Sequence, residues 1–104
     1  MALLTPAEIA EHMKRLDGWT LEPKAIRKTF TLHDFPEAVL FVSALVPGAE
    51  EADHHPDISI HYKRVVLSYS THSEGGLTAK DFDGAAMADA VAADLPHLTD
   101  FTEG

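Results

Sequence analysis

Cysteine is absent from this chain of 104 residues. Its absence excludes disulfide bonds, thiolate nucleophiles and zinc sites built from cysteine. A chain of this length forms one domain, so we expect a single domain over residues 1–104, stabilised by one hydrophobic core. The lack of cysteine also fits a reducing compartment, and we expect the protein to be cytoplasmic.

Positive charge is scarce, and long apolar runs are missing. Lys and Arg number 8 against 17 Asp and Glu, which gives a formal net charge of -9. Because binding to a nucleic-acid backbone requires clustered Lys and Arg, this charge argues against a nucleic-acid partner. No apolar run approaches the roughly 18 residues that span a bilayer, and the N-terminus lacks the basic-then-apolar pattern of a signal peptide. We therefore expect no membrane partner.

Two segments begin with the pattern of a helix capping box, in which a Thr or Asp is followed by Glu three residues later. The first is residues 5–8, and Asp17-Gly18 is expected to end its helix. The second is residues 34–37, and a long apolar helix should follow it. This helix meets Pro47-Gly48, where proline removes a helical hydrogen bond at a cost of about 3 kcal/mol. We expect a break or kink there and a further helical turn over residues 49–53.

Alternation of apolar and polar residues predicts four strands in two hairpins. They are expected over residues 19–22, 25–32, 57–62 and 65–72. Lys28 lies on the otherwise apolar side of the second strand, so we expect that strand near a sheet edge, where lysine is favoured. Ile58, Ile60 and Tyr62 share one side of the third strand, and this side is expected to be buried.

A third helix is expected to begin at Thr78, with Asp81 completing its cap, and to end at Leu95-Pro96. Its predicted packing face consists of small and aromatic residues, namely Phe82, Ala85, Ala86, Ala90 and Ala93. The order α-β-β-α-β-β-α predicts an α+β two-layer sandwich, with a four-stranded antiparallel sheet and the helices on one face. Open sheet edges predict an oligomer, and residues 97–104 are expected to form a tail of uncertain order.

Three of the seven histidines lie where helices or strands are expected to end. His54 and His55 precede the third strand, and His72 ends the fourth. Because a hairpin returns the chain to the point where it entered, His72 should lie close to the His54-His55 pair. If residues 49–53 are helical, Glu50 and His54 also share a face. The sequence therefore predicts a site at this end of the sheet.

Residue types and spacing leave three interpretations of these histidines open. Two histidines could transfer protons, with Glu50, Asp53 or Asp81 orienting their rings. Three histidines and a carboxylate could instead bind zinc, although adjacent histidines diverge and no His-Glu-x-x-His motif is present. In the third interpretation the histidines cap a helix and a strand and bind no ligand. None of these interpretations names a substrate.

The combined pattern resembles the signature of the pterin-4a-carbinolamine dehydratases. The residues that carry the resemblance are Glu50, His54-His55-Pro56, Tyr62, Thr71-His72, Gly76-Leu77-Thr78 and Asp81. The resemblance implies a hydro-lyase that converts 4a-hydroxytetrahydrobiopterin to quinonoid dihydropterin and water, in the recycling of tetrahydropterin. The pterin is then the substrate, and neither a metal nor a redox cofactor is implied.

The resemblance also implies roles for individual residues. His54 and His72 would be the acid–base pair, and His55, the third catalytic histidine, would mainly position the pterin. The three histidines would line the substrate pocket together with Pro56, Thr71 and Ser73. Supporting roles would fall to Glu50 and Asp53, which orient or polarise histidines, and to Asp81, which supports His72.

Some features of the chain depart from the family pattern. Pro47-Gly48 falls where relatives usually continue an unbroken helix, and Ile58 stands where animal members carry Trp. Family members are commonly homodimers or homotetramers, and animal members also act as the dimerisation cofactor of a homeodomain transcription factor. Some relatives lack the histidines and serve as assembly or binding factors. A non-catalytic module that binds a protein partner through a helix or sheet surface is therefore the alternative hypothesis.

Overall fold

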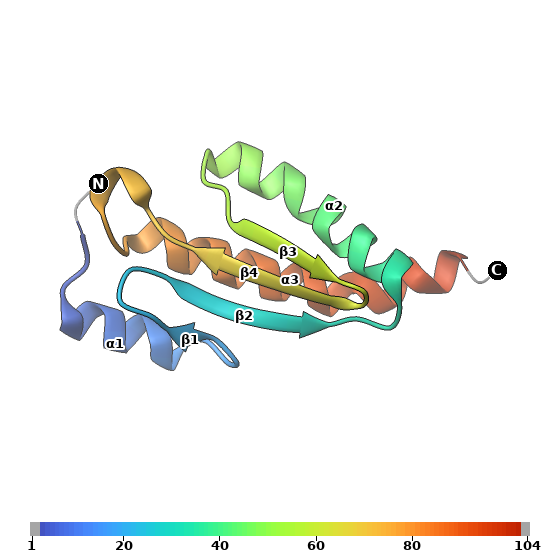
Figure 1. Cartoon of the computed structure of the whole chain (residues 1–104), viewed down its shortest axis with the longest axis horizontal. Coiled ribbons are helices and arrows are strands. Elements are labelled where there is room, and N and C mark those ends of the chain that lie inside the picture. Colours follow the sequence, from blue (N-terminus) through green and yellow to red (C-terminus); the bar gives the residue numbers. More distant parts are fainter. Residues whose placement is uncertain (1–2, 103–104) are drawn as a thin grey trace.

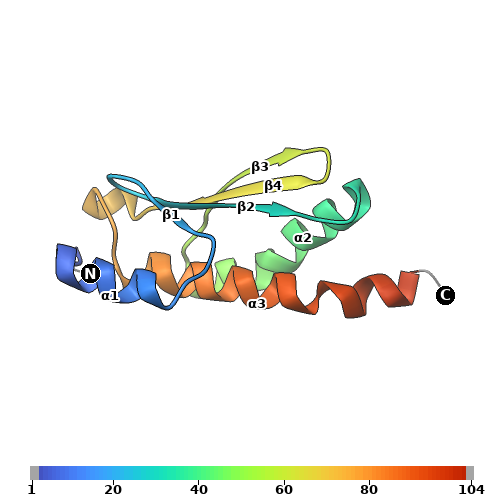
Figure 2. The same ribbon diagram turned by 90° about the horizontal axis from the view of Figure 1, so that it is seen from below.

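The computed structural model describes the backbone of residues 3–102 and the side chains of residues 3–95. One antiparallel sheet lies against helices that all cover the same face (Figures 1 and 2). The elements in chain order are α1 (Pro6–Lys14), β1 (Thr20–Leu21), β2 (Ile26–Thr31), α2 (Phe35–Ala52), β3 (Asp57–His61), β4 (Arg64–Tyr69), the short 3₁₀ helix η1 (His72–Glu74) and α3 (Ala79–Thr102). The predicted α+β sandwich and its element order are confirmed.

The sheet has the order β1-β2-β4-β3, and all its pairings are antiparallel. Both expected hairpins are present, with Leu21 opposite Ile26 in the first and Asp57 opposite Ser68 in the second. The second hairpin therefore brings the start of β3 beside the end of β4. These are the two places where the sequence puts the histidines of interest.

The expectation that the second strand lies near a sheet edge is confirmed, because its neighbour β1 is a two-residue edge strand that pairs only with Ile26 and Arg27. Lys28 lies beyond this pairing, and its partly exposed side chain is compensated by contacts with α3 and with the loop between α1 and β1. Its Nζ lies 2.8 Å from a carboxylate oxygen of Asp89 on α3, and it also donates to the Asp17 carbonyl oxygen. The other oxygen of Asp89 accepts from the Trp19 indole nitrogen at 3.0 Å.

Strand β3 forms the sheet edge opposite β1, and the predicted burial of its apolar side is wrong. Ile58 and Ile60 are exposed by 41% and 38%, and Tyr62 by 68%. The reason lies in the sheet order, since β3 pairs with β4 alone and, among residues 3–102, no strand covers its outer edge. Two neighbouring isoleucines are thus left accessible on an unpaired edge.

The hydrophobic core lies between the sheet and the helices. The expected alternation along β4 is confirmed, because Val65, Leu67 and Tyr69 are fully buried. They pack with residues of α2 and α3, including Phe41, Leu45, Phe82, Ala85 and Ala88. The predicted face of α3 is correct only in part, since Ala86, Ala90 and Ala93 are exposed, whereas Ala88 is buried.

The expected break at Pro47-Gly48 is wrong, because α2 continues through both residues to Ala52. Proline fixes φ near the helical value, so it removes one hydrogen bond but does not prevent the helical backbone. Packing supplies the compensation, since Leu45 and Ala49 on either side are buried. Gly48 permits a close approach of α3: a Cβ built there would lie 3.0 Å from the Met87 methyl carbon.

The expected end of α3 at Leu95-Pro96 is also wrong, because the helix continues to Thr102. As at Pro47, the proline lies in a helical backbone that its own φ permits. The tail expected from residue 97 is therefore helical as far as residue 102, and residues 103–104 lie outside the described part. Among the helices of residues 3–102, none is long and apolar enough to cross a membrane.

Candidate functional site

The C-terminal cap of α2 sets the directions of the two adjacent histidines. Asp53 adopts the left-handed backbone conformation, with φ 51° and ψ 44°, and thereby ends the helix. The His54 backbone nitrogen still donates to the Ala49 carbonyl oxygen at 3.1 Å. The left-handed residue thus turns the chain directly before the pair, and His54 and His55 line different cavities.

His54 is held by the buried carboxylate of Asp81. Its Nε2 lies 2.6 Å from Asp81 Oδ1, and the two side chains are exposed by only 10% and 0%. The other carboxylate oxygen, Oδ2, accepts from the Thr71 hydroxyl at 2.8 Å and from the Thr78 backbone N–H at 2.9 Å. Asp81 therefore fixes the ring of His54, and not that of His72 as the resemblance implied.

Thr71 joins the end of β4 to the start of α3. Its hydroxyl bonds to Asp81 and to the Thr78 hydroxyl, 2.8 Å away, and its backbone N–H donates to the Gly76 carbonyl oxygen. His72 follows directly as the first residue of η1, where its side chain is exposed. The structure thus connects His54 to the residue preceding His72 through Asp81. The predicted meeting of the two chain segments is confirmed.

His55 has a different environment from His54. Its Nε2 lies 2.5 Å from a carboxylate oxygen of Glu50, and both side chains are more than half exposed. Glu50 was expected to share a face with His54, but the left-handed cap at Asp53 brings His55 to it instead. His55 and Pro56 line a cavity of about 270 Å³ beside α2 and β3.

The remaining predicted site residues lie nearby without joining this network. Asp53 and Ser73 are both exposed, in the α2 cap and in η1 respectively. Over the residues with described side chains, the structure places no three His, Asp or Glu side chains so that they could share one metal ion.

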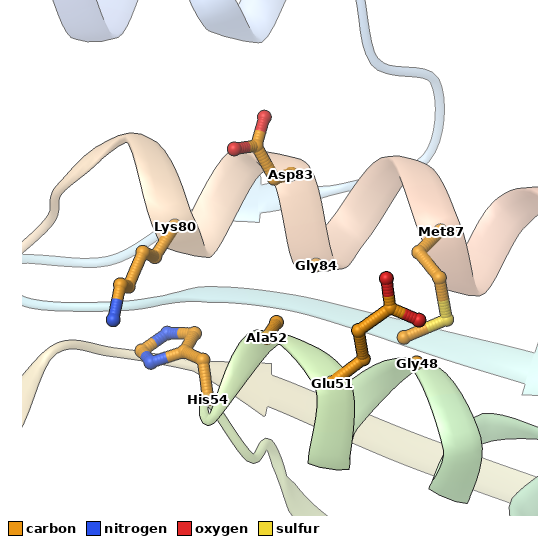
Figure 3. Close-up of a pocket in the computed structure, with 8 residues that line it drawn as sticks. All are labelled: Gly48, Glu51, Ala52, His54, Lys80, Asp83, Gly84 and Met87. Carbon is orange, nitrogen blue, oxygen red and sulfur yellow. The ribbon is translucent and has the colours of Figure 1, made fainter.

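A cavity of about 560 Å³ lies between α2 and α3, with His54 at one end (Figure 3). Sequence reasoning missed its other lining residues, which are Gly48, Glu51, Ala52, Lys80, Asp83, Gly84 and Met87. They recur at three- and four-residue spacing, which places them on facing sides of two helices. This spacing is visible in the sequence, but the expected break at Pro47 prevented its recognition in α2.

Tyr69 lies behind His54, with the two ring centroids 6.2 Å apart and the rings 23° from parallel. The Tyr69 ring packs on the backbone of Gly84, where any Cβ would overlap it. Its hydroxyl is buried and, among the described residues, has no hydrogen-bond partner. Burial, together with the charges of Asp81 and Asp89, raises the pKa of Tyr69 to about 12.

The raised pKa of Tyr69 predicts a loss of stability in alkali. Because the folded pKa of about 12 exceeds the reference value of 10.0, stability is fully present below pH 10 and is lost as the pH rises through 12. The loss from this group amounts to roughly 3 kcal/mol in the free energy of unfolding. Urea denaturation across this pH range should show it, and Tyr69→Phe should remove it. An equal alkaline loss in Tyr69→Phe would contradict the assignment.

Comparison with known proteins places the chain in a family. Residues 2–91 match the family model described as pterin 4 alpha carbinolamine dehydratase. A Roseiflexus castenholzii protein, provisionally named a pterin-4-alpha-carbinolamine dehydratase, is 53% identical over 90 residues, covering 86% of this chain and 97% of that protein. A Sulfolobus acidocaldarius protein with the same provisional name is 49% identical over 76 residues, covering 73% of this chain and 84% of its own.

Solved structures agree with this placement. A transcriptional coactivator/pterin dehydratase from Brucella melitensis matches with a TM-score of 0.83 and 37% identity, covering 86% of this chain and 98% of its own. A pterin dehydratase-like RuBisCO assembly factor of the alpha-carboxysome matches with a TM-score of 0.59 and 24% identity, covering 71% and 86%, and shows the shared fold alone. This chain belongs to the pterin-4-alpha-carbinolamine dehydratase family.

Proposed function

We propose that this protein removes water from 4a-hydroxytetrahydropterins to give quinonoid dihydropterins, in tetrahydropterin recycling. The observation that carries the proposal is the buried Asp81 carboxylate, which holds His54 at the end of a cavity and bonds to the residue before His72. Membership of the dehydratase family supports the same reaction. The proposed chemistry uses neither a metal nor a redox cofactor.

The reaction needs one proton donor and one proton acceptor on adjacent atoms. The bond between C4a and the hydroxyl oxygen breaks, and the departing oxygen takes a proton to leave as water. The proton on ring nitrogen N5 is removed, and its electron pair forms the new double bond between N5 and C4a. Two histidines of different protonation supply both steps, since histidine exchanges protons near neutral pH.

The hydrogen bonds of His54 favour it as the base. Oδ2 of Asp81 already accepts two hydrogen bonds, and the neutral His54 ring donates its Nε2–H to Oδ1. This tautomer leaves the Nδ1 lone pair free to accept the N5 proton, and the carboxylate stabilises the imidazolium that forms. The exposed His72 then protonates the leaving hydroxyl, while His55, oriented by Glu50, helps to position the pterin.

The substrate pocket proposed here comprises the three histidines with Pro56, Thr71 and Ser73. Thr71 is buried and acts through Asp81, whereas Pro56 and Ser73 flank the histidines on the two chain segments that meet. Asp53 contributes the backbone turn that separates His54 from His55. A cytoplasmic location stays a prediction of the sequence.

A homodimer or homotetramer is part of the proposal. The exposed Ile58 and Ile60 lie on the unpaired edge of β3, and a second copy of the chain could cover both the edge and the isoleucines. The alternative function, a binding or assembly module, draws on α2, where Phe35, Val39, Leu40 and Val46 are also exposed. In that case the histidines would be dispensable for partner binding.

The direct test is the rate at which freshly generated 4a-hydroxytetrahydropterin loses water, followed by ultraviolet absorbance. The natural chain should accelerate this step, and the double variant His54→Ala with His72→Ala should not, although its circular dichroism is unchanged. If the folded natural chain gives no acceleration, the dehydratase proposal fails and the binding-module alternative takes its place.

A further inference from the structure

Tyr69, the last residue of β4, lies behind His54 and takes no part in the proposed proton transfer. Its side chain is fully buried, so it does not contact the substrate. Its hydroxyl, with a pKa raised to about 12, keeps its proton at neutral pH and is neither the acid nor the base. The part of Tyr69 that bears on the candidate site is therefore its ring.

A hydrogen bond alone leaves the plane of the His54 imidazole undetermined. Asp81 Oδ1 holds His54 Nε2 at 2.6 Å, but the ring can still turn about the axis that runs from its Cβ to this bond. The Tyr69 ring restricts this rotation, because the two ring centroids are 6.2 Å apart and the planes differ by only 23°. Offset, nearly parallel aromatic rings at such a separation attract each other. Asp81 thus fixes one atom of the imidazole, and Tyr69 fixes its plane.

Two neighbours keep the Tyr69 ring in this place. The first is Gly84 of α3, where a Cβ would come within 2.4 Å of the Tyr69 Cε1 atom. The second is Trp19, whose ring centroid lies 5.9 Å from that of Tyr69. Glycine weakens the interior of a helix relative to alanine, and at position 84 it provides room for the tyrosine ring. A glycine in α3 thus allows an aromatic ring to lie beside His54.

The orientation of the imidazole decides where its free nitrogen points. In the proposed reaction Nδ1 of His54 accepts the proton from N5, and a base must lie within hydrogen-bond reach of the proton that it removes. A turn of the ring moves Nδ1 away from this position even while Nε2 stays on Asp81. Resting on the proposed dehydratase function, we propose that Tyr69 is a positioning residue whose ring directs His54 Nδ1 toward the reacting nitrogen, and that Gly84 acts through Tyr69.

The first test replaces Tyr69 by leucine, which fills part of the space but lacks the flat ring. In Tyr69→Leu, kcat for dehydration should fall about 10–100-fold, since a misplacement of about 1 Å can cost about 10²-fold. KM should stay within about a factor of two, because Tyr69 contacts no substrate. Tyr69→Phe retains the ring and should retain the natural kcat. A kcat for Tyr69→Leu equal to that of the natural chain would overturn the proposal, and so would an equal loss in Tyr69→Phe.

Phe30→Leu separates loss of position from loss of packing. Phe30 is another buried aromatic residue of the sheet, and its ring packs against Trp19 and Phe41. Its replacement should lower the free energy of unfolding as Tyr69→Leu does, but it should leave kcat unchanged. Urea denaturation measures the stability of each variant and identifies conditions in which all are folded. A fall in kcat as large as that of Tyr69→Leu would show that a loosened core is a sufficient cause, and the proposal would fail.

Gly84 is tested by a double-mutant cycle with Tyr69. In Gly84→Ala the added methyl group overlaps the tyrosine ring and displaces it, so kcat should fall about tenfold. In the Tyr69→Leu background the same substitution should have no further effect, because the ring that it displaces is absent. Equal effects of Gly84→Ala in the two backgrounds would contradict the claim that Gly84 acts through Tyr69.

NMR relaxation of the His54 ring carbons separates this inference from the function on which it rests. The measurement needs no substrate and reports ring motion on the picosecond to nanosecond timescale. The ring should be rigid in the natural chain and in Tyr69→Phe, and more mobile in Tyr69→Leu. If the natural chain is active but Tyr69→Leu changes neither the ring motion nor kcat, the positioning role is wrong and the dehydratase stands. If the folded natural chain gives no acceleration, the proposed function fails and the role of Tyr69 in this reaction fails with it.

Discussion

Replacing His54 by alanine is expected to lower kcat for dehydration by about 10²–10⁴-fold, the usual loss when a general acid or base is removed. Stability should change much less, because Asp81 keeps its bonds to Thr71 and to the Thr78 backbone when the imidazole is absent. The measurement is the single-turnover rate of water loss, with circular dichroism to verify the fold.

Two further histidine variants sharpen this prediction. His61→Ala is the matched control, because His61 is an exposed histidine at the opposite end of β3, and its kcat should equal that of the natural chain. His55→Ala should raise KM more than it lowers kcat, because an exposed His55 bound to Glu50 positions the substrate. A kcat for His54→Ala within a factor of about two of the natural value would remove His54 from the mechanism.

Replacing Asp81 by alanine is expected to cause the largest loss of stability, about 3–5 kcal/mol in the free energy of unfolding. The Asp81 side chain is fully buried and accepts hydrogen bonds from His54, Thr71 and the Thr78 backbone N–H. Its removal leaves these donors buried without their partner, and such unmet groups cost about 1–3 kcal/mol each. Folded domains are stable by only about 5–15 kcal/mol, so partial unfolding at 25 °C is within reach.

Asp83→Ala provides the matched comparison for this loss. Asp83 lies on the same helix two residues away, but its side chain is exposed, so its removal should change the free energy of unfolding by no more than about 0.5 kcal/mol. Both values come from urea denaturation followed by circular dichroism. Similar losses in the two variants would show that the Asp81 network contributes little to the stability of the fold.

The sheet could be predicted from the sequence because its signal is local. Alternation along residues 65–69 specified which side chains of β4 enter the core, and the tight connections specified both hairpins. The partner of Lys28 could not be predicted in this way. Lys28 is compensated by Asp89, which lies 61 residues away, and nothing in the local pattern indicates that partner.

The continuous helix α2 shows the limit of arguing from one residue at a time. The cost of a proline was applied to Pro47 alone, whereas the helix is held by buried side chains before and after it. Had residues 49–52 been joined to the preceding helix, Gly48 and Glu51 would have been placed on one face. The α2 side of the cavity would then have been predictable.

The location of the candidate site could be predicted from the sequence, but the hydrogen bonds among its residues could not. The hairpin argument correctly brought the start of β3 to the end of β4, whereas Asp81, which was expected to support His72, contacts His54. Which histidine Asp81 contacts depends on the left-handed conformation of Asp53, an unusual choice for a non-glycine residue that spacing does not reveal. Lys80 was missed because its position in the cavity depends on the packing of two helices.

The most direct test of this account is the dehydration rate of four proteins: the natural chain, His54→Ala, Asp81→Asn, and the double variant. Asp81→Asn preserves the shape of the side chain but removes its charge, and urea denaturation identifies conditions in which all four are folded. If Asp81 acts through His54, the asparagine lowers kcat in the natural background and has no further effect once His54 is alanine. Equal effects of Asp81→Asn in both backgrounds, or no acceleration by the natural chain, would contradict the account.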